Sequence, residues 1–254
     1  MCKPTCLIIQ SGAMSDVFIV APIAKFYHDK GYTVFWPVRE HYFGLLSNYF
    51  PYVNTGLVDE FRYPRVHKDW LKSDTMHLKK MIQTFHYDLV VDTSDRDVLP
   101  DQRIDENFEE YKYRVAGVPF AMKNHLSWDR DLEKEQRLIA HIEDNYGINI
   151  EKDRFIVTHG DRKELPKSEY RDIINMTPII TEYDKFEIVD WFPIIAKAEA
   201  VYCVESATHQ FIDGCINKLK YENEGMKFYL IPHLLGDEGD GYAINKNWSK
   251  KYMR

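Results

Sequence analysis

The sequence predicts an α/β protein built from two Rossmann-like domains that face a cleft. Two observations support this. Short apolar runs alternate with stretches of helical periodicity in each half of the chain, and longer, charged helices separate the two series between residues 109 and 148. Clefts between such domains are common ligand sites. We therefore place one domain at residues 1–126 and the other at residues 127–254.

The chain opens with a buried strand, a loop of small residues and a helix. The apolar run that begins at Cys6 predicts the strand, and apolar positions at helical spacing predict a helix from Val17 to Lys30. Gly31 is expected to take the left-handed conformation that ends a helix, and residues 32–36 are the next strand. Asp16 thus falls at the carboxyl end of a parallel strand, where ligands bind in open α/β sheets.

The rest of the first domain continues the alternation. The patterns predict a helix at 41–50, a weak strand at 53–61, a helix at 70–85 and a buried strand at 87–92. Asp92 ends that strand and opens an Asp-Thr-Ser-Asp run, in which one side chain faces the cleft or, as is typical of such runs, caps a helix.

A charged helix is expected to join the two domains and to follow a linker at 126–129. It covers residues 129–142, with Leu132, Leu138, Ile139 and Ile142 on its apolar side. Strands are then predicted at 154–158, 177–181, 200–204 and 227–231, and helices at 167–175, 188–198 and 208–219. The acidic, glycine-rich stretch 236–241 lacks the spacing of a calcium loop and predicts a turn, followed by a tail at 248–252 that packs across the first domain.

Composition excludes several classes of function. A net charge of −7 argues against binding driven by nucleic-acid phosphates. The four cysteines lack the paired spacing of a zinc site, and no Gly-x-Gly-x-x-Gly follows a strand, which disfavours a nicotinamide-dependent oxidoreductase. Without a signal peptide or an apolar run of about 18 residues, we expect a cytoplasmic protein with no membrane span.

Three short stretches resemble the heptosyltransferase-type glycosyltransferases of glycosyltransferase family 9, which have the GT-B fold. Ala13 to Phe18, with Pro22 in the helix, is similar to the family's opening loop, and Ser15 stands where the family has glycine. Lys163 keeps the family's spacing to Pro166, although leucine replaces tryptophan between them.

The third stretch is Glu205-Ser206-Ala207-Thr208-His209. It resembles a strand end with Asp-Ser/Thr-Gly followed by a histidine that starts a helix. Glu205 replaces the aspartate, Ala207 replaces the glycine, and His209 comes one residue early.

The resemblance implies an inverting transfer of sugar from a nucleotide-activated donor to an acceptor hydroxyl on a glycan or lipid-linked sugar. Asp16 is the candidate general base, because a hydroxyl must lose its proton as the new bond forms. The resemblance implies no cofactor and no essential metal. It implies donor binding by Arg162, Lys163, Glu205, Ser206, Thr208 and His209, with Ser15 and Asp92 on the acceptor side.

Several of these residues also have a purely structural interpretation. Ser15 or Asp16 is a good helix cap, Arg162 and Lys163 fit a solvated loop, and a lone histidine such as His209 often serves as a structural hydrogen-bonding residue. Two other functions stay open. One is a non-catalytic nucleotide or nucleotide-sugar binding protein of the same fold, and the other is a sugar-nucleotide epimerase.

Overall fold

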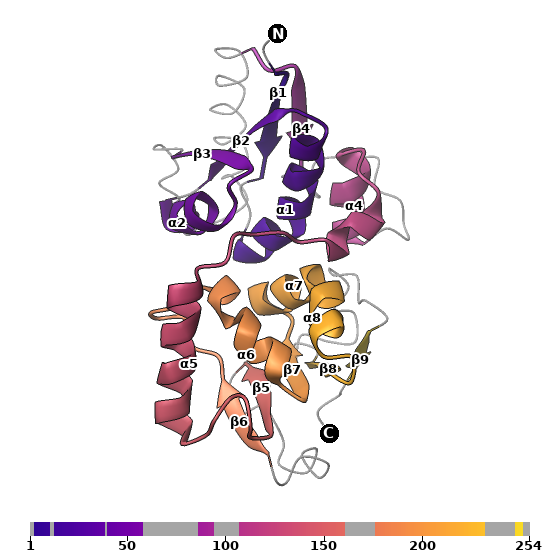
Figure 1. The fold of residues 1–254 in the computed structure, drawn as a ribbon. Helices are drawn as coiled ribbons and strands as arrows, with labels where there is room; N and C mark the ends of the chain where they lie inside the picture. Colours follow the sequence, from indigo (N-terminus) through magenta and orange to yellow (C-terminus); the bar gives the residue numbers. More distant parts are fainter. Residues whose placement is uncertain are drawn as a thin grey trace, which may run out of the picture. The chain divides into compact units, whose positions relative to one another are not determined.

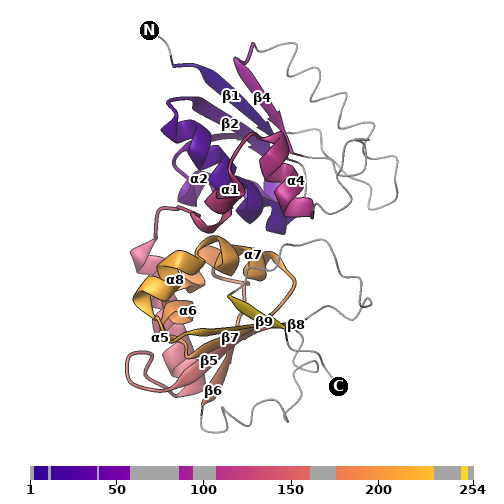
Figure 2. The ribbon, with the colours of Figure 1, turned by 90° about the vertical axis from the view of Figure 1, so that its right-hand side faces the viewer.

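The computed structural model describes residues 3–10, 13–38, 40–57, 86–93, 107–160, 176–231 and 247–250. The chain divides into two compact units, which we call unit 1 (residues 1–122 and 127–129) and unit 2 (residues 123–126 and 130–254). Each unit contains a parallel sheet with helices packed on it (Figures 1 and 2). The predicted α/β class with parallel sheets is therefore confirmed.

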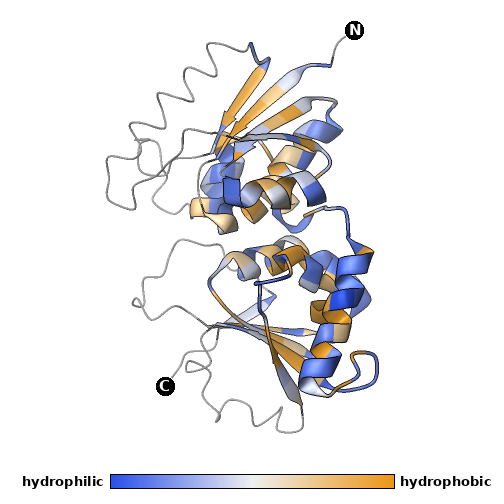
Figure 3. Ribbon diagram, turned by 90° about the vertical axis from the view of Figure 1, so that its left-hand side faces the viewer, coloured by the Kyte–Doolittle hydropathy of each residue, from blue (hydrophilic) through white to orange (hydrophobic). Residues whose placement is uncertain are grey.

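Unit 1 is a four-stranded parallel sheet, as far as its described residues show, in the order β3-β2-β1-β4. Its elements are β1 (Thr5–Ile9), α1 (Met14–Asp29), β2 (Thr33–Val38), α2 (Glu40–Tyr49), β3 (Val53–Leu57), β4 (Leu89–Asp92) and α4 (Phe108–Val115), and a 3-10 helix (Phe120–Asn124) begins in this unit and ends in unit 2. Helix α1 packs against β2, β3 and α4. In Figure 3 the strands of this unit are largely hydrophobic, as expected for a sheet buried by helices.

Helix α1 begins earlier than its apolar periodicity predicts. It starts at Met14 because the Asp16 carboxylate accepts the backbone N–H of Ala13, which satisfies one of the amide groups left free at a helix start. The helix ends before Gly31, whose φ of 91° confirms the predicted left-handed residue.

Strand β4 differs from its prediction in burial. The prediction of a strand is confirmed, but Val90 is 38% exposed and only Val91 of this strand is buried. The reason is position, since β4 lies at the edge of the four described strands. Asp92, at its carboxyl end, is exposed.

Unit 2 is a five-stranded parallel sheet over its described residues, in the order β6-β5-β7-β8-β9. Its elements are α5 (Leu132–Tyr146), β5 (Phe155–His159), β6 (Thr177–Ile180), a 3-10 helix (Ile188–Trp191), α6 (Phe192–Lys197), β7 (Ala200–Val204), α7 (Ala207–Gly214), α8 (Ile216–Glu222), β8 (Lys227–Ile231) and β9 (Trp248–Lys250). Helices α6, α7 and α8 lie together on one side of this sheet (Figures 1 and 2).

Several parts of unit 2 differ from their predictions. Leu132 is 62% exposed instead of lying on the apolar side of α5, because the helix begins only at this residue, after the Asp131 side chain caps it. Within the tail predicted at 248–252, Trp248–Lys250 forms a strand. It pairs in parallel with β8 and so extends the sheet of unit 2 itself.

The structure has two helices, α7 and α8, where a single helix was predicted at 208–219. A contact with a residue far away in the sequence interrupts the helix. The carbonyl of Gly214 accepts the backbone N–H of Leu126 at 2.9 Å, and a Cβ on Gly214 would lie 3.0 Å from that of Leu126. The chain therefore turns at Cys215, which separates α7 from α8. Leu126, expected in a linker, is buried. The predicted helices at 70–85 and 167–175, and the turn at 236–241, lie outside the described residues.

Candidate functional site

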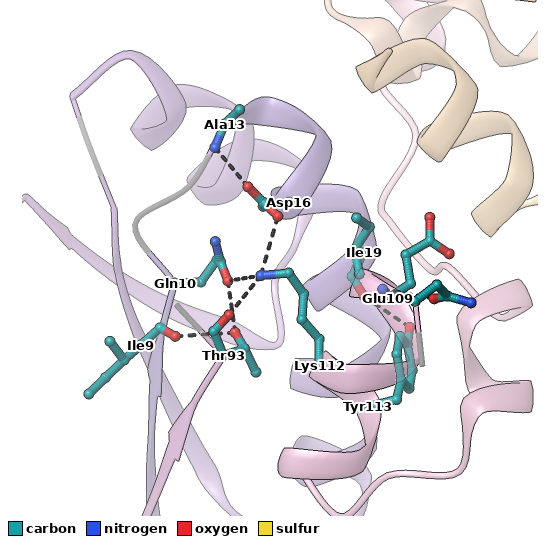
Figure 4. Close-up of polar contacts among 10 residues, drawn as sticks. Ile9, Gln10, Ala13, Asp16, Ile19, Thr93, Glu109, Lys112 and Tyr113 are labelled. Carbon is teal, nitrogen blue, oxygen red and sulfur yellow. Dashed lines mark hydrogen bonds and ion pairs between the residues drawn. The ribbon is translucent and has the colours of Figure 1, made fainter. Parts of the chain in front are cut away.

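In unit 1, polar side chains gather where β1 and β4 end and α1 begins. Gln10 follows β1, Thr93 follows β4, and Asp16 lies in the first turn of α1; all three are buried. The Thr93 hydroxyl lies 3.2 Å from the Ile9 carbonyl and 2.9 Å from Gln10 Oε1, which it contacts as a hydrogen-bond donor. Hydrogen bonds thus connect the carboxyl ends of the two neighbouring strands, β1 and β4 (Figure 4).

The two oxygens of the Asp16 carboxylate have different partners. Oδ2 accepts the backbone N–H of Ala13 at 2.8 Å. Oδ1 lies 3.3 Å from Lys112 Nζ, an ion pair whose geometry is not that of a hydrogen bond. Oδ1 is fully buried, while the side chain as a whole is 10% exposed. This carboxylate is therefore fixed on both sides and largely shielded from water.

Lys112 is the central residue of this cluster, and the sequence reasoning missed it. Its side chain comes from α4, is fully buried, and donates hydrogen bonds to Gln10 Oε1 and to the Thr93 carbonyl, both at 2.7 Å. The ring of Phe108 lies 4.2 Å from the ammonium and adds a cation–π contact. A buried lysine is rare unless it is paired, and this one joins the ends of two strands to the start of α1 (Figure 4).

The two residues expected on the acceptor side differ in exposure. Ser15, next to Asp16 in α1, is buried, whereas Asp92 is exposed. The structural interpretation of Asp16 as a helix cap is correct as far as it goes, since its carboxylate does accept the Ala13 amide. Capping alone does not account for Lys112.

In unit 2, polar contacts join the carboxyl ends of β5, β6 and β7. His159 Nδ1 lies 2.6 Å from the Thr181 hydroxyl, and the Tyr183 hydroxyl lies 2.6 Å from that of Thr208. Burial lowers the pKa of His159 to about 4, so its ring is neutral at pH 7. These contacts tie the loop after β6 to the first turn of α7.

Gly160 shows how closely β5 and β7 approach each other at this edge. Its φ is 140°, and a Cβ there would lie 2.9 Å from Val204 Cγ1. Only glycine fits such a position without strain. Arg162 and Lys163, two and three residues further on, lie outside the described residues.

The third predicted stretch is divided between the surface and the interior. Glu205 and Ser206 are half-buried, and the Ser206 hydroxyl caps α7 by accepting the His209 backbone N–H at 3.3 Å. Thr208 and His209 are buried. Glu205 and Ser206 are therefore more exposed than Thr208 and His209.

His209 belongs to a buried cluster. Its ring meets that of Trp248 edge-on, with centroids 4.8 Å apart, and the Trp248 indole N–H donates to Asp213 Oδ1 at 3.1 Å. Asp213 also forms an ion pair with Lys123. Burial is the main reason that the pKa of His209 falls to about 4, with Asp213 raising it and Lys123 lowering it further. The ring is therefore neutral at pH 7, and in this conformation it has no exposed atom that a nucleotide-sugar donor could contact.

A cavity of about 480 Å³ opens beside the carboxyl end of β6. Apolar side chains and the Trp191 indole form part of its lining, with polar and charged side chains around them. The lining residues are Leu138, His141, Ile142, Asn145, Tyr146, Ile180, Glu182, Asp184, Lys185, Phe186 and Trp191. Its size is within the range of small-molecule sites.

The described residues contain neither a metal-binding cluster nor a helix that could span a membrane. Within these ranges, no three His, Cys, Asp or Glu side chains are grouped so that they could hold a metal ion. No helix among the same residues is long and apolar enough to cross a membrane.

Taken together, the two sheets and their order along the chain define the fold of glycosyltransferase family 9 heptosyltransferases, as the resemblance in sequence predicts. The glycosyltransferase of family 9 from Veillonella parvula DSM 2008 aligns with 99% of this chain and 86% of its own, with a TM-score of 0.60 and 10% identity. ADP-heptose LPS heptosyltransferase II of E. coli aligns with 97% of this chain and 90% of its own, with a TM-score of 0.51 and 10% identity.

A third structure is the dodecameric, iron-containing heptosyltransferase TibC in complex with ADP-D-β-D-heptose. It aligns with 97% of this chain and 62% of its own, with a TM-score of 0.53 and 8% identity. No protein-family model matches the chain, and no curated protein matches it in sequence. At these identities the similarity concerns the fold, and the chemistry has to be argued from the residues.

Proposed function

We propose that the protein is a glycosyltransferase that moves a sugar from a nucleotide-activated donor to an acceptor hydroxyl, with Asp16 as general base. The observation that carries this proposal is the Asp16 carboxylate, fixed through both oxygens at the carboxyl end of β1 in a chain with the family 9 fold. A carboxylate held at a strand end is where that fold would place a catalytic group.

The acceptor hydroxyl approaches Oδ2 of Asp16 in this proposal. Oδ1 is closed off by Lys112, and the exposed tenth of the side chain leaves Oδ2 as the oxygen that substrate can reach. The carboxylate takes the hydroxyl proton as the oxygen attacks the anomeric carbon from the face opposite the nucleotide. One displacement of this kind inverts the configuration of that carbon.

Unit 2 binds the donor. The nucleoside diphosphate that leaves needs stabilisation of its negative charge, and the positive end of the helix dipole at the start of α7 is suited to this task. Arg162 and Lys163 supply positive charge, and Glu205 and Ser206 accept or donate hydrogen bonds to ribose or sugar hydroxyls. The ADP-heptose in the TibC structure supports a nucleotide sugar as the donor class.

The remaining features of the reaction follow from the same assignment. The acceptor is a glycan or a lipid-linked sugar, with Ser15 and Asp92 on its side, and no cofactor or essential metal takes part. Catalysis further requires that the strand ends of both units act on one donor–acceptor pair, which is the cleft expected from the sequence.

The first experiment is a thermal-shift panel of nucleotides and nucleotide sugars, ADP-heptose among them. A ligand at 100 times its dissociation constant stabilises a protein by about 2.7 kcal/mol, which such a panel detects readily. The nucleotide sugar with the largest shift is then assayed for release of nucleoside diphosphate. If none of the panel binds, the proposed function is wrong.

The second experiment tests the base. Asp16→Asn keeps an oxygen for the Ala13 amide but loses the basic carboxylate, so turnover is expected to fall by about 10²–10⁴-fold while donor affinity is kept. Asp29→Asn, at the exposed end of the same helix, is the matched control and is expected to keep wild-type turnover. Unchanged turnover in Asp16→Asn excludes Asp16 as the base.

A non-catalytic nucleotide-sugar binding protein is the second candidate, and the burial of Thr208 and His209 favours it. Donor binding by the wild-type protein, with neither hydrolysis nor transfer, would support that alternative. A changed sugar recovered in the absence of acceptor would instead identify an epimerase.

A further inference from the structure

We infer that Lys112 is a positioning residue for the Asp16 general base: it fixes the plane of the carboxylate so that Oδ2 faces the acceptor hydroxyl. This inference rests on the proposed function and deepens it. It assigns a role to a buried lysine that contacts the site and that neither sequence pattern nor resemblance pointed to.

The first argument is the geometry of the ammonium. A lysine ammonium has three hydrogens in fixed directions. Two of them go to Gln10 Oε1 and the Thr93 carbonyl at 2.7 Å, and Asp16 Oδ1 lies 3.3 Å from the same nitrogen. The strand ends thus fix the ammonium, and the ammonium in turn fixes one oxygen of the base (Figure 4).

The second argument concerns rotation of the carboxylate. The terminal torsion of an aspartate is broad, so the side chain does not choose its own plane. Ala13 N–H holds Oδ2, but a single contact permits rotation around it. Lys112 contacts the other oxygen, and two contacts on opposite oxygens define the plane. A misplacement of about 1 Å in a catalytic group costs about 10²-fold in rate.

The third argument is that stability alone does not explain this lysine. A buried ion pair is often no more stabilising than apolar side chains of the same volume, because both charges lose their water. The start of α1 is already capped through Ala13, so that contact needs no lysine. The hydrogen bonds of the ammonium to Gln10 and Thr93 do not involve Asp16. The ammonium therefore stays in place beside the carboxyl group when Asp16 takes up a proton.

The test uses the full chain and Lys112→Met, which keeps an unbranched apolar side chain one atom shorter than lysine and removes the ammonium with its charge and hydrogens. With ADP-heptose, or whichever nucleotide sugar of the panel binds, we expect kcat for nucleoside diphosphate release to fall about 10–100-fold. The KM for donor is expected to stay within about twofold, since the donor-binding residues lie in unit 2. Lys25→Met is the matched control, a lysine that pairs with Asp29 on the surface of α1.

The double variant Lys112→Met/Asp16→Asn separates positioning from a general structural role. A residue that acts only through Asp16 costs nothing more once the base is gone, so the double variant is expected to match Asp16→Asn in kcat. Additive losses, a raised donor KM, or wild-type kcat in Lys112→Met would each overturn the inference. Should circular dichroism show that Lys112→Met does not fold, Lys112→Gln, which keeps an amide donor, is measured against the same outcomes.

Failure of this inference is distinguishable from failure of the proposed function. A dead Asp16→Asn beside a fully active Lys112→Met rejects the positioning role and leaves the base in place. An active Asp16→Asn, or a panel without any bound nucleotide sugar, rejects both.

Discussion

The buried His209 ring predicts that acid destabilises unit 2, in addition to any effect of His159. Burial lowers the pKa of His209 from 6.5 to about 4 in the folded protein. Between those two values the unfolded chain binds a proton that the folded chain does not, so stability falls as pH falls. The contribution is complete above pH 6.5 and is lost by about pH 4.

The magnitude follows from the two pKa values. One pKa unit corresponds to 1.36 kcal/mol, and between pH 7 and pH 4.5 the shift of His209 accounts for about 2 kcal/mol of lost stability. His209→Gln cannot be protonated and is expected to lose about 2 kcal/mol less than wild type over this interval. Its lost packing against Trp248 lowers stability at both pH values equally and therefore cancels in the comparison.

The assay is urea unfolding at the two pH values, followed by circular dichroism. Hydrogen exchange of residues 200–222 assigns the transition to unit 2. His125→Gln, at an exposed histidine, is the control and is expected to keep the wild-type pH dependence. A wild-type and a His209→Gln protein whose stabilities change equally with pH, within about 0.5 kcal/mol, would refute the reasoning.

Three further predictions concern packing and reactivity. Leu138→Ala is expected to cost about 2–5 kcal/mol by leaving a cavity under α5, whereas Leu132→Ala on the same helix changes stability by less than about 0.5 kcal/mol, as urea titration would show. Gly160→Ala should destabilise unit 2 by about 1–3 kcal/mol in thermal unfolding, because its Cβ meets Val204 at positive φ, while Gly44→Ala, with open space around it in α2, does not destabilise the protein. Burial raises the pKa of Cys6 and Cys203 to about 12 and that of Cys215 further, so a disulfide reagent at pH 8, followed by mass spectrometry, should label these three thiols only after denaturant is added.

The elements of the fold were predictable wherever a short apolar run had to be a buried parallel strand. Strands β1, β5 and β7 were located in this way and are buried almost throughout, because strands covered on both faces are apolar without alternation. Apolar runs do not indicate whether a strand lies in the middle or at the edge of its sheet. Such a run marked β4 as buried although its place at the edge leaves Val90 exposed.

The errors in unit 2 arose from contacts between residues far apart in sequence. The apolar periodicity of 208–219 continues through Cys215, and only the hydrogen bond from Leu126 to the Gly214 carbonyl explains why the helix stops. Likewise, nothing within Trp248–Lys250 itself states that its partner is β8. Local patterns specify elements, whereas these features depend on which distant backbone groups are left to be satisfied.

In the candidate site, too, local sequence patterns located one residue, Asp16, and missed another, Lys112. Asp16 was predictable from its place after β1, but Lys112 lies in a helix where the neighbouring Glu109, Tyr111 and Tyr113 are also buried. In such a helix the charged residues do not mark a solvent-exposed face. From sequence alone, a buried charge there cannot be told from an exposed one. A signal was nonetheless present at the strand ends, because Gln10 and Thr93 end runs that are otherwise apolar and must be hydrogen-bonded if buried. Buried acceptors at the ends of adjacent strands require a shared donor, and a cation on the helix that covers them meets that requirement.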